Sequence, residues 1–353
     1  MSVSAGSTSN SAQAHYNAGK ALYQAGEYET ALTEFQDALR RTPESAAVHF
    51  WIGKAQVGRG NTEEALNSFQ HSIRLDPTNV KPHLEMGRAY VAADQLGAAA
   101  ASFRQAQRLS PQSAEPLREI AAVLIQQCQY DAALEELQRA LALEQGAALT
   151  HVLFGRVYDL KGMRQQADAA YRESERLDPR VYAQAQVANG AQMQAAGRLG
   201  DAVKQYRAAT LTDPTYMEAF TRLGSACFEN YQKVDAADAF RAATCLAPND
   251  YSTHYLLGYT LLYQSQVNLK TVVFKRKVAP PDEAIKALLR AVDLDPNRTD
   301  AHFALGKAYE AAGVRHLARE QMERVLALDS NGRDAVSARE ALRTLYQTDR
   351  ARD

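Results

Sequence analysis

The sequence predicts an all-α protein in which a pair of helices repeats along the chain and stacks into a solenoid. A small residue returns about every 34 positions, at Gly19, Gly53, Gly87, Ala121, Gly155, Gly190, Gly224, Gly258 and Gly306. An alanine keeps step with it, at Ala31, Ala65, Ala99, Ala133, Ala167, Ala202, Ala236, Ala284 and Ala318. A large side chain follows each alanine by four positions, at Phe35, Phe69, Phe103, Leu137, Tyr171, Tyr206, Phe240, Leu288 and Met322. The three positions recur together nine times, so the pattern is very unlikely to arise by chance.

The stretch 46–77 shows how one unit is built. Gly53 lies midway through a first helical pattern and Ala65 begins a second, so two small side chains fall where an antiparallel helix pair comes closest. From Phe69 to Leu75 the apolar residues are spaced by about three and four, which is the period of a helix. The final proline ends the second helix, because proline cannot donate an amide hydrogen and disfavours helix in the residue before it.

A period of about 34 residues with this pattern resembles the tetratricopeptide repeat family, whose units are helix-turn-helix pairs. The resemblance implies an α-solenoid of about nine such units that forms a right-handed superhelix with a C-terminal capping helix. We expect a disordered tail at 1–11 and a capping helix with a short tail at 333–353. The expected repeats are 12–45, 46–79, 80–113, 114–147, 148–182, 183–216, 217–250, 251–298 and 299–332.

Composition narrows the possible functions. The 40 basic and 41 acidic residues give a net charge of −1, so we expect no nucleic-acid binding. The sequence has no uninterrupted apolar span of about 18 residues, so we expect no membrane insertion. Its Ser- and Ala-rich start lacks the features of a signal peptide. Three widely separated cysteines favour a reducing compartment, and we expect a cytoplasmic protein.

The sequence contains none of the common catalytic, phosphate-binding or calcium-binding motifs. Scattered carboxylates such as Glu63 and Glu64 lie where they stabilise the start of a predicted helix. We therefore predict a protein that is not an enzyme, with no cofactor and with no catalytic or metal-binding residues.

Six of the eight histidines occupy one equivalent position, four residues before the small residue of their repeat: His15, His49, His83, His151, His254 and His302. A metal-binding ladder is one interpretation. Packed helices, however, lie about 8 to 10 Å apart, whereas each ligand of a zinc ion stands about 2 Å from it. We therefore expect half-buried packing residues, whose pKa values burial would lower.

The eighth repeat carries an insertion between its two helices. Gly258 and Ala284 are 26 residues apart, where the other repeats have 12. One interpretation of the inserted segment, at about 265–281, is a longer surface loop or a short hairpin. The other is a recognition loop for an acidic partner or a contact for self-association, because exposed apolar residues beside like charges need a reason to stay out of the core. The candidate residues are Lys270, Phe274, Lys275, Arg276 and Lys277.

The first helices of the repeats are the candidate binding surface, because the resemblance implies that they line a concave groove. Basic residues follow several of the small residues, and aromatic residues lie close by on the same helices. The predicted groove residues are Tyr16, Lys20, Tyr23, Phe50, Trp51, Lys54, Arg88, Arg156, Tyr255, Tyr259, Phe303 and Lys307. Aromatic anchors supply contact area and cations select charge, so we expect a protein or peptide ligand with acidic and apolar side chains. The alternative is that these cations only keep the helices in solution.

One branch of the family grips a C-terminal carboxylate with a set of Lys, Asn, Asn, Lys and Arg. The matching positions here hold Tyr16, Lys20, Trp51, Lys81 and Glu85, so we do not expect that clamp. We predict a non-enzymatic scaffold that binds a peptide or a helix of a partner protein in the groove. The alternatives are a targeting or regulatory subunit of an enzyme complex, such as a glycosyltransferase or a peptidase, and self-association through the insertion.

Overall fold

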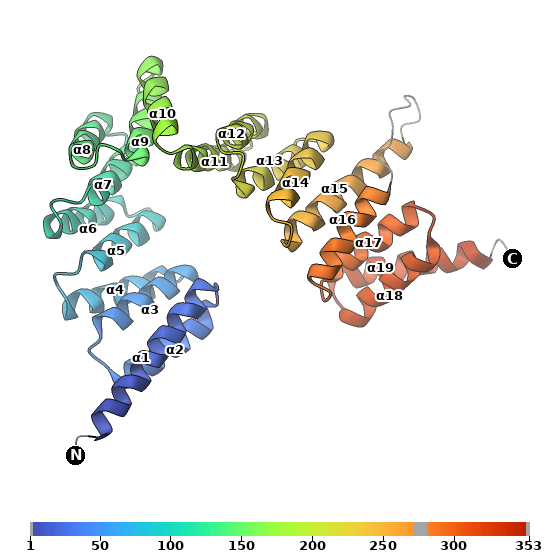
Figure 1. Cartoon of the computed structure of the whole chain (residues 1–353), viewed down its shortest axis with the longest axis horizontal. Helices are drawn as coiled ribbons and strands as arrows, with labels where there is room; N and C mark the ends of the chain where they lie inside the picture. Colours follow the sequence, from blue (N-terminus) through green and yellow to red (C-terminus); the bar gives the residue numbers. More distant parts are fainter. Residues whose placement is uncertain (1–2, 271–280, 351–353) are drawn as a thin grey trace. The chain divides into compact units, whose positions relative to one another are not determined.

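The computed structural model describes residues 3–270 and 281–350, and the side chains of residues 11–264 and 282–347. All the regular secondary structure in these ranges is α-helical, and it forms 19 helices (Figure 1). The chain divides into two compact units, Met1–Leu177 and Asp178–Asp353. The predicted all-α solenoid of paired helices is confirmed.

The first unit contains five helix pairs, and each helix packs against the next one along the chain (Figure 1). The helices of this unit are α1 (Val3–Gln24), α2 (Tyr28–Arg41), α3 (Ala46–Gly58), α4 (Thr62–Leu75), α5 (Val80–Ala92), α6 (Leu96–Leu109), α7 (Glu115–Gln126), α8 (Tyr130–Leu143), α9 (Ala148–Leu160) and α10 (Arg164–Leu177).

The second unit contains four helix pairs and a final single helix, again with consecutive helices packed together (Figure 1). The helices of this unit are α11 (Pro179–Ala195), α12 (Leu199–Thr212), α13 (Met217–Glu229), α14 (Lys233–Leu246), α15 (Tyr251–Lys270), α16 (Pro281–Leu294), α17 (Thr299–Ala311), α18 (Arg315–Leu328) and α19 (Arg333–Arg350).

In nearly every pair, a glycine of the first helix lies against a large side chain of the second. A Cβ atom added to Gly19 would lie 2.6 Å from the ring of Phe35, which is fully buried. In the fourth pair Ala121 and Leu137 take these places, and both are fully buried. The repeating pattern of the sequence is therefore the central packing contact of each pair. The other glycine contacts are Gly53 with Phe69, Gly87 with Phe103, Gly155 with Tyr171, Gly190 with Tyr206, Gly224 with Phe240, Gly258 with Leu288 and Gly306 with Met322.

The turn inside most pairs contains one residue with a positive φ angle. Gly26 and Gly60 have φ angles of 80° and 81°, which glycine adopts readily at the C-terminal end of a helix. Asp94, Cys128 and Tyr231 occupy the same place in other pairs, with φ angles of 57°, 58° and 60°. For a bulky side chain such as that of Tyr231 this conformation is strained.

Two segments differ from the prediction. Helix α1 begins at Val3, so most of the stretch expected as a disordered tail has a helical backbone. That stretch contains no proline. Helix α15 continues to Lys270, so the first part of the insertion extends this helix and does not form a loop or a hairpin. Neither proline nor glycine follows Gly258 before the end of α15, so nothing in the sequence stops the helix earlier.

Helix α11 begins at Pro179, before the predicted start of the sixth repeat at 183. The side chain of Asp178 accepts hydrogen bonds from the amides of Arg180 and Val181, and proline suits the first position of a helix. These two residues give α11 a strong start signal that the repeat period alone does not show. The exact boundaries of the nine repeats stay a prediction.

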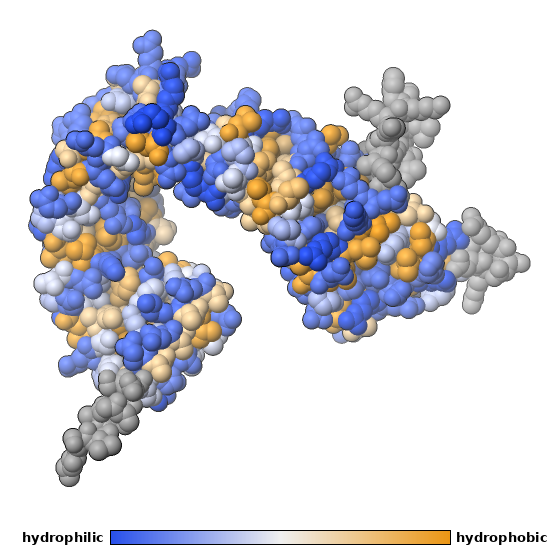
Figure 2. Space-filling model, viewed as in Figure 1, coloured by the Kyte–Doolittle hydropathy of each residue, from blue (hydrophilic) through white to orange (hydrophobic). Residues whose placement is uncertain are grey.

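The last helix, α19, packs against α17 and α18, and the predicted capping helix is confirmed. Ala338 and Leu342 of α19 form a buried cluster with Met322 and Val325 of α18. Polar and apolar residues are mixed over the surface of both units (Figure 2). None of the helices in the described ranges is long and apolar enough to span a membrane.

Candidate functional site

Six of the eight predicted groove residues of the first unit come together in one place. Trp51 Nε1 donates a hydrogen bond of 3.0 Å to the hydroxyl of Tyr16, and the ring centroids of Trp51 and Tyr23 are 5.3 Å apart. Phe50 contacts Trp51 at a centroid distance of 5.8 Å. We call this cluster of α1 and α3 the N-terminal aromatic patch, and it consists of Tyr16, Lys20, Tyr23, Phe50, Trp51 and Lys54.

Both lysines of the N-terminal aromatic patch lie over its rings. Lys20 Nζ is 5.3 Å from the ring centroid of Trp51, and Lys54 Nζ is 5.4 Å from it. Lys54 also lies 3.8 Å from a carboxylate oxygen of Glu85. Lys20 forms no ion pair in the described part of the chain, so it is the cation of this patch that is most available to an acidic ligand.

Arg88 of α5 lies on the expected helix, but its charge is compensated within the protein. Its guanidinium group pairs with Glu85 at 3.1 Å, with Glu115 at 2.7 Å and with Glu119 at 2.6 Å. Burial would lower the pKa of Arg88, but the hydrogen bonds and charges of these glutamates raise it above its ordinary value. Glu115 and Glu119 belong to α7, the first helix of the next pair. The predicted row of basic residues on the first helices is therefore interrupted at Arg88.

The other predicted cations of the groove are Arg156 and Lys307. Lys307 pairs with Glu310 on its own helix, α17. Arg156 is half-buried on α9. Among the residues that the structure describes, no ion pair or ring contact joins Arg156 to the other predicted groove residues.

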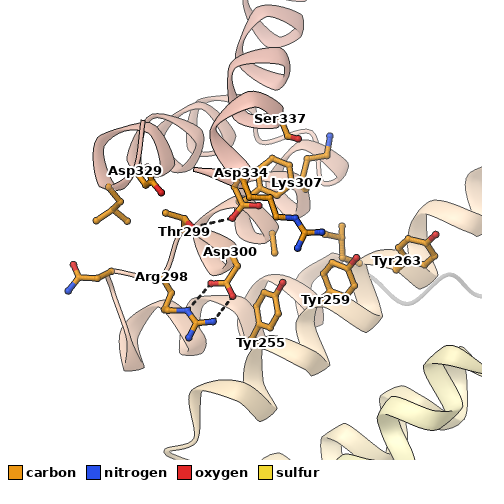
Figure 3. Close-up of a pocket in the computed structure, with 16 residues that line it drawn as sticks. Tyr255, Tyr259, Tyr263, Arg298, Thr299, Asp300, Lys307, Asp329, Asp334 and Ser337 are labelled. Carbon is orange, nitrogen blue, oxygen red and sulfur yellow. Dashed lines mark hydrogen bonds and ion pairs between the residues drawn. The ribbon is translucent and has the colours of Figure 1, made fainter. Parts of the chain in front are cut away.

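The predicted groove residues of the second unit all line one cavity of about 960 Å³. Tyr255 and Tyr259 lie on α15, and Phe303 and Lys307 on α17. Figure 3 shows the cavity between α15 and the elements around α17 and α19. We call it the tyrosine pocket, and its polar lining also includes Tyr263, Arg298, Thr299, Asp300, Asp329, Arg333, Asp334 and Ser337.

Part of the pocket lining comes from a row of stacked tyrosines along α15, which we call the tyrosine ladder: Tyr251, Tyr255, Tyr259 and Tyr263. All of them except Tyr251 line the pocket. Their successive ring centroids are 5.9, 5.9 and 6.3 Å apart, and the planes of neighbouring rings differ by 7°, 29° and 26°. Tyr255 and Tyr259 were predicted as groove residues from the sequence, whereas Tyr251 and Tyr263 were not. Their spacing of four residues, which places them on one face of a helix, was the signal for the whole row.

Each end of the tyrosine ladder carries a cation of the chain itself. The guanidinium carbon of Arg298 lies 4.6 Å from the ring centroid of Tyr251. Arg298 donates hydrogen bonds of 3.1 and 2.7 Å to the two oxygens of Asp300, which also accepts one of 2.7 Å from the hydroxyl of Tyr251. At the other end, Lys233 Nζ lies 4.3 Å from the ring centroid of Tyr263.

Tyr255 is half-buried and lies near two carboxylates, Asp300 and Asp334. Burial raises the pKa of Tyr255 to about 12, and the charges of Asp300 and Asp334 add to the effect. Burial would also raise the pKa of Asp300, but the hydrogen bonds from Arg298 and Tyr251 lower it below its ordinary value. At neutral pH the pocket therefore presents the neutral phenol group of Tyr255 and the ionised carboxylate of Asp300.

Two of the equivalent histidines link consecutive helix pairs. Nε2 of His302 lies 3.0 Å from the carbonyl oxygen of Pro296, and Nε2 of His254 lies 3.1 Å from that of Pro248. Both prolines follow the end of the preceding helix, where carbonyl groups lack a helical partner. Burial lowers the pKa of His83 and that of His49, as expected for packing residues. In the described ranges, no group of three or more His, Cys, Asp or Glu residues is placed to hold a metal ion.

Most of the insertion lies outside the described residues. Lys270 is the last residue of α15. Phe274, Lys275, Arg276 and Lys277 lie outside the described residues. A recognition loop or a self-association contact in this segment stays a prediction.

Comparison with protein families explains the repeated helix pairs. A model of the tetratricopeptide repeat matches residues 16–80, 84–148 and 194–251, which together make up more than half of the chain. The chain belongs to the tetratricopeptide repeat family. A second model, of the TPR repeat, matches residues 282–313. The resemblance inferred from the sequence is confirmed.

Several solved structures of tetratricopeptide repeat (TPR) and related proteins are similar to this TPR protein. A MamA protein shares 19% identity over 48% of this chain and 92% of its own, with a TM-score of 0.42. YrrB, a TPR protein with an unusual peptide-binding site, shares 20% identity over 68% of this chain and 99% of its own, with a TM-score of 0.37. A tetratricopeptide repeat protein from Parabacteroides merdae ATCC 43184 shares 16% identity over 71% and 99%, with a TM-score of 0.48. Comparison with curated proteins finds no match.

Proposed function

We propose that this TPR protein is a non-catalytic scaffold that binds a segment of a partner protein on the first helices of its repeats. The tyrosine pocket is the observation that carries the proposal. Four residues selected from the sequence as groove residues, Tyr255, Tyr259, Phe303 and Lys307, all line this one cavity. Tyrosine is well suited to such contacts, because it offers a large apolar ring and a polar hydroxyl at little cost in conformational entropy.

The size and exposure of the tyrosine pocket suit a peptide segment. Its volume of about 960 Å³ is large enough for several side chains. Tyr259 is 38% exposed, so a good part of its ring is open to a ligand. A partner that covered it would bury apolar surface beside fixed hydrogen-bonding groups, as is usual at the centre of an interface.

An acidic ligand with apolar anchors is proposed only for the N-terminal aromatic patch. There Lys20 and Lys54 lie beside four aromatic rings, and only Lys54 has a carboxylate nearby, at 3.8 Å. Arg88 and Lys307, which were expected to extend the basic surface, are paired with glutamates.

Two further parts of the proposal concern the role of the protein in a complex and its location in the cell. A targeting or regulatory role in an enzyme complex would use the same surfaces, with an enzyme as the partner. We propose a cytoplasmic location because Cys128 and Cys245 are exposed free thiols, which suit a reducing compartment.

Affinity capture from the native cell extract tests the proposal with four baits. They are the wild type, a Lys20→Glu/Lys54→Glu variant, a Tyr259→Ala variant, and a control Arg40→Glu variant, in which the changed side chain is 72% exposed on α2. We expect a partner that the wild type and the control both retain and that at least one groove variant loses. Equal recovery with all four baits, or no partner with the wild type, would contradict the proposal. An enzyme among the retained proteins would identify the chain as its targeting or regulatory subunit.

A further inference from the structure

Arg298 shows how the tyrosine ladder holds a guanidinium group. Its Cζ atom lies 4.6 Å from the ring centroid of Tyr251, so the group is stacked on the ring. Its Nε and Nη2 atoms donate hydrogen bonds to the two oxygens of Asp300, at 3.1 and 2.7 Å. Stacking on an aromatic face while pairing with a carboxylate through two nitrogens is a combination that arginine can make and lysine cannot.

The two middle rings of the ladder have no such cation. Lys233 lies over Tyr263 at the far end, as Arg298 lies over Tyr251. In the described part of the chain, no cationic group lies over Tyr255 or Tyr259, and both line the tyrosine pocket. Figure 3 shows these two rings in a row with Tyr263 along α15, on the side of the helix that faces the cavity. Tyr259 is 38% exposed and contacts Phe228 at a centroid distance of 5.9 Å, and Tyr255 is half-buried. These are the two rings of the ladder over which no cation of the described chain lies.

Two carboxylates of the pocket are free of ion pairs within the described ranges. Asp334 accepts a hydrogen bond of 3.1 Å from the hydroxyl of Thr299. Asp329 accepts one of 3.1 Å from the amide of Asn331. Each carboxylate has room for further donors, since two oxygens can accept about four hydrogen bonds.

The cations of the pocket are mostly compensated. Arg298 is held by Asp300, and Lys307 by Glu310. Arg333 is exposed at the start of α19 and is the remaining cation of the lining. Two unpaired carboxylates against one exposed cation leave the pocket with a negative balance.

The spacing of the rings also fits an extended peptide. The centroids of Tyr255 and Tyr259 are 5.9 Å apart. An extended chain places alternate side chains on one face about 6.6 Å apart, because each residue advances it by about 3.3 Å. Two arginines separated by one residue would therefore reach neighbouring rings, whereas adjacent arginines would point to opposite sides.

We propose that the tyrosine pocket binds an extended partner segment with two arginines separated by one residue, whose guanidinium groups stack on Tyr255 and Tyr259, one of them also pairing with Asp334. The inference rests on the proposed scaffold function and specifies the chemistry of the partner at this site. Arg298 on Tyr251 and Asp300 is the arrangement that the incoming arginines repeat.

Calorimetric titration of the full chain with synthetic peptides tests this proposal. The probe is an acetylated and amidated nine-residue glycine and serine peptide with arginines at its fourth and sixth positions. Matched peptides carry citrulline, which keeps the shape of arginine without its charge, or glutamate at the same positions, or arginines at the fourth and fifth positions. We expect the first peptide to bind at least about tenfold more tightly than each of the others, because a charge-assisted hydrogen bond is lost or misplaced in them.

Three variants locate the binding. Asp334→Asn keeps a hydrogen-bond acceptor for Thr299 but loses the charge of the carboxylate. We expect it to lower the affinity for the arginine peptide about tenfold. Tyr259→Leu should also lower the affinity for the arginine peptide. Asp238→Asn is the control, since Asp238 is a 65% exposed carboxylate of α14 outside the pocket, and it should bind like the wild type. Circular dichroism melting checks that each variant is folded.

Several outcomes would overturn the proposal. Equal affinity for the citrulline peptide, unchanged binding in Asp334→Asn, or no binding of the arginine peptide at millimolar concentration would each do so. Tighter binding of the glutamate peptide, lost in Tyr259→Leu, would overturn the arginine assignment and still leave the pocket as a site for protein segments. Failure of this inference is thus distinguishable from failure of the scaffold function.

Discussion

The ring of Phe69 lies so close to the backbone of Gly53 that a Cβ atom on residue 53 would be 2.5 Å from ring carbon Cε1. The ring is fully buried, so it has no open space to move into. Related contacts recur in nearly every pair, which explains why a small residue and a large one keep a fixed distance along the sequence. The two helices of a pair approach each other at this point.

Gly53→Ala is expected to destabilise the protein by about 1 to 3 kcal/mol, because the added methyl group must displace a buried ring. The free energy of unfolding from urea denaturation measures the effect. Gly97→Ala is the matched control, because no atom lies within 4 Å of a Cβ added at Gly97. It should leave stability unchanged or raise it by up to about 1 kcal/mol, since alanine favours helix more than glycine does. Equal effects of the two substitutions would contradict this account of the contact.

Tyr231→Gly is expected to stabilise the second unit. Tyr231 has a φ angle of 60° and its side chain is 86% exposed, so the native state holds a strained backbone and gains little from burial of the ring. Relief of the strain is worth about 1 to 2 kcal/mol, and the greater freedom of glycine in the unfolded chain offsets up to about 1 kcal/mol of it. Thermal and urea denaturation should show a net gain. A loss of stability would mean that the exposed ring makes a stabilising contact.

Acidification is expected to destabilise the protein partly through His83. Burial lowers the pKa of His83 below 6.5, its ordinary value, so between the folded and unfolded pKa values the unfolded chain binds more protons. The contribution of His83 to stability is therefore present above about pH 6.5 and is lost as the pH falls below it. The melting temperature should be lower at pH 5.5 than at pH 7.5.

His83→Gln tests whether this residue is the cause. Gln186 stands at the equivalent position of another repeat, so the fold accepts glutamine there. The variant should lose less stability than the wild type between pH 7.5 and pH 5.5. An unchanged melting temperature in the wild type, or the same decrease in both proteins, would show that the burial of His83 does not control the pH response.

Arg88→Ala is expected to cost about 1 kcal/mol, because it leaves Glu85, Glu115 and Glu119 close together without a cation. The estimate is modest since the arginine side chain is 41% exposed and water screens its charge. Arg40→Ala, which removes a single exposed ion pair with Asp37, should change stability by only a few tenths of a kcal/mol. Urea denaturation at low salt and at 1 M salt should show the difference shrinking with salt. Equal losses at both salt concentrations would argue against an electrostatic network.

Most of the fold was predictable because its central contacts are local in the repeat. A glycine and the ring that covers it lie in one helix pair, so their spacing appears directly in the sequence. The same reasoning located Tyr255, Tyr259, Phe303 and Lys307, because residues at one register of the first helices face the same side. The helical period therefore predicts which residues of the first helices lie on the same side.

The pairing of the charged residues in the predicted groove could not be inferred from the register alone. Arg88 has the expected position, but Glu115 and Glu119 reach it from the first helix of the next pair. Whether the charge of Arg88 is compensated therefore depends on contacts between repeats. Likewise, α15 continues into the insertion and ends at Lys270. The insertion lies outside the repeat pattern, so the pattern does not predict this end.

Site-specific photo-crosslinking in the native cell tests the central claim, that a partner protein binds on the first helices. A photoreactive phenylalanine analogue replaces Tyr259 of α15 in one variant and Leu289 of α16, an exposed residue of the second helix in the same pair, in another. We predict a discrete crosslinked partner from position 259 and none from position 289. Crosslinking of the same partner from position 289 alone, or no crosslink from position 259, would contradict the account.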